Sequence, residues 1–106
     1  MADVYYRVGS RLPVLRVQLK NADGTAASIA GNTGVDLRCQ PENAAAPLKF
    51  TGACTVIDAP TGVVEYTWGA NDLDTAGLYS LEWRVNFAGG YEVFPSTPNK
   101  FWLEVV

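Results

Sequence analysis

The sequence of 106 residues predicts an all-β protein, an antiparallel β-sandwich of seven to eight short strands in a single domain that takes in residues 1–106. Apolar and polar residues alternate with a period of two in one stretch after another, which is the pattern of a strand with one buried face and one wet face. Turn signals rich in Gly, Pro, Asn and Asp separate these stretches. No long stretch has the periodicity of an amphipathic helix.

The clearest strand of the chain runs from Tyr79 to Phe87. Its polar residues alternate with apolar ones, and three of the apolar ones are aromatic. Aromatic side chains bury a large apolar area, so we expect this strand near the middle of the core. The same alternation extends the predicted core to other strands, and its members are Leu37, Cys39, Tyr66, Trp68, Leu81, Trp83, Val85 and Phe87.

A short turn precedes this strand, and its order Asp74-x-Ala76-Gly77-x-Tyr79 is the most specific local pattern of the chain. The pattern is similar to the tyrosine corner of immunoglobulin-like sandwiches, in which the Tyr hydroxyl bonds back to the backbone of the preceding loop. Antibody domains carry a Cys two residues after that Tyr, whereas this chain has Leu81. We therefore expect an immunoglobulin-like sandwich that lacks the inter-sheet disulfide. The alternative is an ordinary strand after an ordinary Asp/Gly turn.

The other strands are expected, in chain order, within residues 3–8, 15–19, 35–40, 48–58, 64–68, 91–94 and 101–105. The stretch 48–58 is expected to break near Gly52 into one or two strands. Its inward face is left open, because Thr55 and Ile57 compete with Cys54 and Val56. Residues 88–90 predict a tight hairpin turn.

The two cysteines are too few for a disulfide scaffold and do not have the spacing of metal ligands. Cys39 shares the apolar face of its strand with Val35 and Leu37, which predicts a buried free thiol that packs as a small hydrophobe. A Cys39–Cys54 bridge between neighbouring strands is the alternative. We expect no structural disulfide.

The composition excludes several classes of protein. The formal net charge is −3 and the basic residues are scattered, which disfavours nucleic acid and membranes as partners, because both reward clustered Lys and Arg. The chain has no histidine, which removes His-based triads, His general bases and most zinc sites. The first 15 residues do not have the pattern of a signal peptide, and the sequence has no apolar run that could span a membrane, so we expect neither a leader nor a membrane span. We expect it to fold in a reducing cytoplasm.

Enzyme chemistry has little support in the sequence. No serine lies in a Gly-x-Ser-x-Gly elbow, and there is no glycine-rich phosphate loop. Asp72 and Asp74 are close together, but in a turn such residues commonly cap and shape the backbone. Calcium is the alternative ligand for this pair. We expect no enzymatic activity, no cofactor and no metal.

Aromatic residues on the outward face of strands are the candidate partner surface. If Phe101 and Leu103 face inward, Trp102 faces outward. By the same alternation Tyr5 and Phe94 are expected outside, and large exposed apolar groups often mark a contact surface. The alternatives are that the chain's own terminus covers one edge, or that one strand is turned over.

Five stretches, taken in order and spacing, resemble a known family. They read TGVVEYxW at 61–68, DxDTAGxY at 72–79, ExxVxFxxG at 82–90, ExFP at 92–95 and FxLEV at 101–105. They resemble the immunoglobulin-like N-terminal module of tailed-phage baseplate upper proteins and related small virion proteins, over about residues 10–106. In longer relatives this module anchors a receptor-binding or fibre region.

The resemblance implies a non-enzymatic structural protein of the virion, made in the host cytoplasm. As a stand-alone module it would decorate a head or sit at a neck, tail or baseplate. Its partners would be other virion proteins of the capsid, neck, tail or baseplate, with a homo-oligomer also possible. A carbohydrate-binding module with an exposed aromatic platform is the alternative from another class. An enzyme or a surface-adhesion domain has less support.

Overall fold

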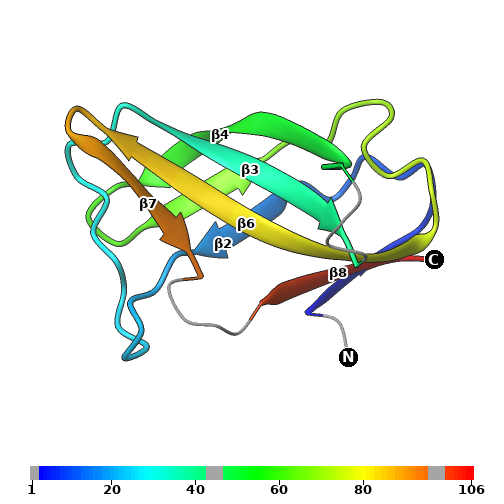
Figure 1. Cartoon of the computed structure of the whole chain (residues 1–106), viewed down its shortest axis with the longest axis horizontal. Coiled ribbons are helices and arrows are strands. Elements are labelled where there is room, and N and C mark those ends of the chain that lie inside the picture. The colour runs from blue at the N-terminus through cyan, green and yellow to red at the C-terminus, as the bar shows by residue number, and fades with distance from the viewer. Residues whose placement is uncertain (1–2, 43–46, 96–99) are drawn as a thin grey trace.

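The computed structural model describes residues 3–42, 47–95 and 100–106. These residues form eight strands and no helix (Figure 1). In chain order the strands are β1 (Val4–Tyr6), β2 (Leu15–Gln18), β3 (Gly34–Pro41), β4 (Phe50–Asp58), β5 (Val63–Tyr66), β6 (Gly77–Phe87), β7 (Gly90–Phe94) and β8 (Phe101–Val105). The predicted all-β class is confirmed.

The eight strands join into one curled sheet, a half-barrel, in the order β1-β8-β6-β3-β4-β5-β2, with β7 paired to β6 beside β8. The prediction of a purely antiparallel arrangement is wrong at one place, because β1 runs parallel to β8. The connection from β1 to β8 spans nearly the whole chain, so no short hairpin imposes an antiparallel pairing on them. The sheet is therefore mixed.

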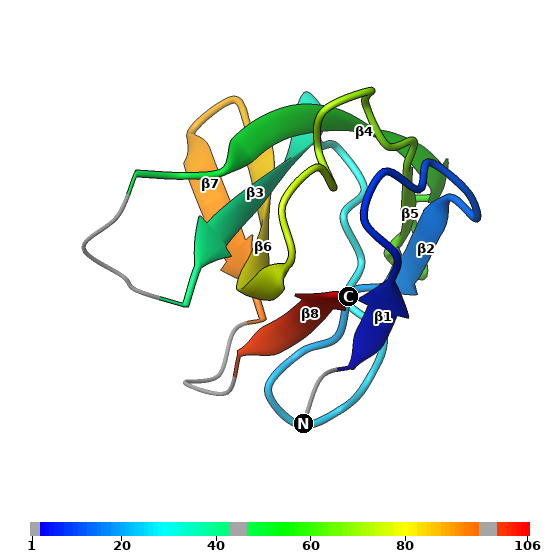
Figure 2. The ribbon, with the colours of Figure 1, turned by 90° about the vertical axis from the view of Figure 1, so that its right-hand side faces the viewer.

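Strand β4 turns the sheet from one side of the core to the other. Its first half, Phe50–Cys54, pairs with β3, and its second half pairs with β5 across a bulge between Val56 and Asp58. Figure 2 shows the result, with β3, β6 and β7 on one side of the curl and β5 and β2 on the other. We call the first group, with β8 and β1, the large wall, and β5 with β2 the small wall.

The predicted break near Gly52 is wrong, because β4 continues through it. A Cβ atom at Gly52 would lie 2.7 Å from the ring of Tyr66. The glycine therefore leaves the space into which the Tyr66 ring packs, and it does not end the strand. The inward face of β4 is the one that carries Cys54 and Val56, which pack against the core, whereas Thr55 is exposed on the other face.

The core lies between the two walls. Seven of the eight predicted core residues are buried, and the eighth, Phe87, is partly buried against them at the end of β6. Aromatic rings link the walls, since Trp68 makes edge contacts with Tyr6 at 4.9 Å and with Tyr66 at 5.3 Å. Leu73, Ile29 and Ala27, from connections between strands, are also buried.

The two cysteines are free. In the β3–β4 ladder Cys39 lies opposite Phe50 and Cys54 lies opposite Val35. Four residues of strand separate them, roughly 13 Å, whereas bridged Cα atoms lie within about 7 Å. Burial is the main cause that raises the pKa of both thiols to about 12.

Candidate partner-binding surface

Two of the three predicted surface aromatics lie on the outer face of the large wall. Tyr5 is directly opposite Glu104, and Trp102 is two residues before Glu104 on the same strand and the same face. Tyr5 is 57% exposed, and Trp102 is partly buried. The parallel pairing of β1 with β8 therefore makes neighbours of two aromatic side chains that are far apart in sequence.

Hydrogen bonds hold the Tyr5–Trp102 region in place. The backbone N–H of Trp102 donates to the Asp3 carboxylate at 2.7 Å, and the N–H of Asp3 donates to the Trp102 carbonyl at 2.9 Å. The Lys100 ammonium lies 5.8 Å from the centre of the Trp102 ring, within the range of a cation–π contact.

Phe94 is not on this surface, and the prediction that placed it there is wrong. Phe94 is 4% exposed and lies opposite Trp83 in the β6–β7 ladder. Residues opposite each other in a ladder point to the same face, so Phe94 points inward with Trp83. Glu92 does share its face, as the alternation predicted, but near the hairpin turn that face is exposed.

The outer face of the large wall has a polar centre. Arg38 forms an ion pair with Glu82 at 3.1 Å, and Asn86 donates to the Asp36 carboxylate at 3.2 Å. These are cross-strand pairs of β3 and β6 and contribute little to stability because they are partly exposed.

Tyr91 adds an aromatic ring to the same face, although it is not among the aromatic residues predicted to lie outside. The Arg84 guanidinium lies 4.2 Å from the centre of its ring. Tyr91 is 57% exposed and lies opposite Asn86. The signal that could have found it is its place directly after the predicted hairpin turn, where register fixes its face. Exposed or half-exposed aromatics thus occur at both ends of this face.

The turn before β6 has the geometry of the predicted corner. The Tyr79 hydroxyl donates to the Thr75 carbonyl at 2.7 Å, and burial raises the pKa of Tyr79. Ala76 and Gly77 lie between them, and Gly77 begins β6 with a φ of 154°. A hydrogen bond from the Lys49 ammonium holds the pKa of Asp74 below its usual value.

Asp72 has a structural role that differs from that of Asp74. It accepts hydrogen bonds from the Tyr66 hydroxyl at 2.6 Å and from the Gly69 N–H at 2.7 Å. Burial, followed by this carboxylate, raises the pKa of Tyr66. The two aspartates thus serve different partners. Within the described ranges no three His, Cys, Asp or Glu side chains form a group that could hold a metal ion.

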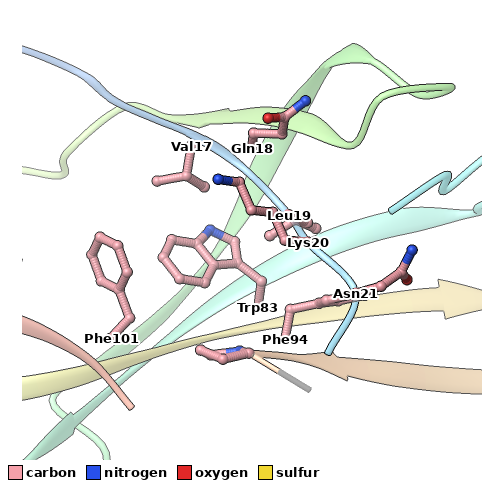
Figure 3. A pocket seen from close by; sticks show the side chains of 9 residues that line it. Val17, Gln18, Leu19, Lys20, Asn21, Trp83, Phe94 and Phe101 are labelled. Carbon is pink, nitrogen blue, oxygen red and sulfur yellow. The ribbon is translucent and has the colours of Figure 1, made fainter. Parts of the chain in front are cut away.

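A cavity of about 320 Å³ opens between the two walls. The end of β2 and the residues after it form one side, and aromatic side chains of the large wall form the other (Figure 3). The residues that line it are Val17, Gln18, Leu19, Lys20, Asn21, Trp83, Phe94, Pro95 and Phe101. Trp83 and Phe101 meet edge to face with their ring centres 5.1 Å apart.

No family model, no curated protein and no solved structure matches this chain. No helix among the described residues is long and apolar enough to cross a membrane.

Proposed function

We propose that this protein is a non-enzymatic structural component of a tailed-phage virion that works through contacts with other virion proteins. The observation that carries the proposal is the outer face of the large wall. On this face Tyr5 and Trp102 lie at one end and Tyr91 lies at the other, with a polar centre between them, although Tyr5 is far from the other two in sequence. Aromatic residues in a polar frame are typical of protein contact surfaces.

We further propose that the curled sheet is an immunoglobulin-like sandwich. Three features support this. The chain's first strand lies parallel to its last, β3, β6 and β8 are neighbours in one wall, and Tyr79 bonds back to the turn before its strand. The stretches that resemble the phage module lie on β5, on the turn before β6 and on β6, β7 and β8.

The contact surface suits assembly into a symmetric particle. Many copies bind at once in such a particle, so a modest affinity for each contact is enough. A catalytic role has no comparable support, since the polar groups of the outer face are cross-strand pairs and those of the turn before β6 hold the loop.

The first test is quantitative mass spectrometry of purified virions from the source phage or an induced prophage. A copy number close to that of the major capsid protein would indicate head decoration, and a low copy number would indicate a neck, tail or baseplate component. Absence from the particle would contradict the proposal.

A variant pair tests the surface itself. Tyr5→Ala combined with Trp102→Ala should lower incorporation into particles and leave the fold intact. Ile57→Ala is the matched control, because Ile57 is a 43% exposed apolar residue on β4, outside this face. Equal incorporation of both variants would argue against the outer face as the docking surface.

Carbohydrate binding is the second candidate, supported by the exposed ring of Tyr5 next to Trp102. It has weaker support than protein contact, because Trp68 and Trp83 are 1% and 3% exposed and Arg84 covers one side of the Tyr91 ring. A glycan-array signal that disappears in Trp102→Ala would favour this candidate over the virion role.

A further inference from the structure

We infer that the free edge of β2, with the cavity beside it, receives an extended segment of a partner protein as an added strand. This inference rests on the proposed function, because it names one contact through which the protein would bind another virion protein. Three features of this region fit an extended peptide.

The first feature is the unpaired backbone of β2. The sheet order ends at β2, and the Leu19 N–H donates to the Gly62 carbonyl at 2.8 Å. In an antiparallel pair, alternate residues direct both backbone groups to the same neighbour. Leu15 and Val17 therefore bond toward β5, as Leu19 does. Arg16 and Gln18 direct their N–H and C=O groups to the side where no described strand lies, and such an edge is a template for another strand.

The second feature is the apolar cavity that begins at this edge. Val17 and Leu19 line it together with Trp83, Phe94 and Phe101. Successive side chains of a strand point to opposite faces, so a strand laid beside β2 would direct every second side chain toward the core. The volume of about 320 Å³ has room for one or two such side chains.

The third feature is an indole N–H without a partner. Trp83 is 3% exposed, and its Nε1–H donates no hydrogen bond to a described residue. Among the described residues, Arg84 Nε is the one fully enclosed side-chain nitrogen or oxygen that has no partner. The Trp83 nitrogen also has no partner, so it is not fully enclosed, and it is open to the cavity that its ring lines. Figure 3 shows this nitrogen on the edge of the ring nearest Val17 and the β2 segment. Every peptide unit carries a carbonyl that could accept this bond.

A free small molecule could fill the cavity and accept from Trp83, but it could not satisfy the backbone edge of β2. An extended peptide satisfies all three features at once, which is the logic of strand addition. The lining holds one charged side chain, Lys20, which forms no ion pair with any residue that the structure describes. We therefore expect the bound segment to alternate apolar and polar residues and to carry an acidic residue near Lys20.

The test uses the whole protein as bait for a random library of short linear peptides, followed by hydrogen-exchange NMR of the bait with the selected peptides. The expected result is protection of the Arg16 and Gln18 amides. Peptides that bind without protecting these amides, or a library that yields no binder, would overturn the inference.

Two variants sharpen the result. Gln18→Pro removes the outward N–H and leaves the β2–β5 bonds, so it should weaken peptide binding by at least about tenfold. Gln18→Ala loses the same side-chain bond to the Thr61 carbonyl but keeps the N–H, and it should bind as the parent does. If Gln18→Pro binds normally and free phenylbutyrate displaces the peptides, the cavity is a small-molecule site and the inference is wrong.

The two proposals fail separately. A protein that is present in virions but has an edge that binds no peptide leaves the proposed function standing without this contact. An edge that binds peptides in a protein absent from virions keeps the strand addition as a binding mode and removes the virion role.

Discussion

The inner and outer faces of the large wall carry similar residue types that have different roles. Trp83 and Trp102 are both on paired strands of this wall, yet Trp83 is 3% exposed inside the curl, whereas Trp102 is partly buried on the outside beside Tyr5. Burial on the inner face supplies stability, because apolar area leaves water there on folding. The outer face keeps apolar area exposed, which another molecule could bury on binding. Variants of the two faces test whether stability and partner contact separate in this way.

The largest expected effect is on the inner face. Trp83→Ala should lower the free energy of unfolding by about 3–5 kcal/mol, because it removes a ring packed against Phe101 and enlarges the neighbouring cavity. Chemical denaturation with far-ultraviolet circular dichroism measures the loss. A change below about 1 kcal/mol would mean that the inner face does not hold the wall together.

The next effect concerns the crossing strand. Gly52→Ala should destabilise the protein by about 1–3 kcal/mol, because the new methyl group meets the Tyr66 ring at 2.7 Å. Gly89→Ala is the control, since no atom lies near its Cβ position. The two variants are compared by thermal unfolding, and equal melting temperatures would contradict the packing of Tyr66 against β4.

A smaller effect belongs to the turn before β6. Tyr79→Phe should cost about 1 kcal/mol, because it deletes the bond from the Tyr79 hydroxyl to the Thr75 carbonyl and keeps the ring. Hydrogen exchange of the amides at 72–77 should quicken more than exchange in the middle of β6. An unchanged exchange pattern would show that this bond does not hold the turn.

The ion pair of the same turn gives a weak pH dependence. Asp74 has a pKa below its reference value of 3.8, first because Lys49 donates a hydrogen bond to it. A depressed carboxyl pKa contributes stability that is present above the unfolded pKa and is lost as the pH falls through the folded pKa. As the pH is lowered from about 5 to about 2, the melting temperature of Asp74→Asn should therefore fall slightly less steeply than that of the parent protein. A steeper fall in that variant would contradict the sign.

The smallest effect on stability is expected outside. Trp102→Ala should change the free energy of unfolding by less than about 1 kcal/mol, because the Trp102 ring lies on the solvent-facing side of β8 and not in the core. The same variant should weaken incorporation into particles. If Trp102→Ala melts the protein instead, the outer face belongs to the core and the separation of stability from contact is lost.

Local pattern was enough for much of this fold. The period-two alternation of Tyr79–Phe87 predicted both the strand and its inward face, because a strand's geometry alone decides which residues share a face. The same alternation placed Trp102 and Tyr5 on outer faces of their strands. The Asp74–Tyr79 pattern predicted a hydroxyl near the preceding backbone, since Tyr79 and its partner Thr75 are only four residues apart in sequence.

The alternation did not decide which face of a strand is the inner one where both carry apolar residues. Phe94 and Glu92 share a face, and only the pairing of Phe94 with Trp83 turns that face inward. Gly52 read as a break because a glycine weakens a strand, while the ring of Tyr66, 14 residues later in sequence, makes it a fit. Both errors came from partners that lie far away in the chain.

The sequence by itself therefore determined the β class, the strands, most of the core and the free thiols, since each depends on the chemistry of near neighbours. Tertiary structure alone decided the parallel pairing of β1 with β8, the passage of β4 between the walls and the placement of Tyr5 and Trp102 on neighbouring strands of one face. It also decided the cavity beside the β2 edge. The physical reason is that pairing across long separations is set by the packing of the whole core, which no local pattern encodes.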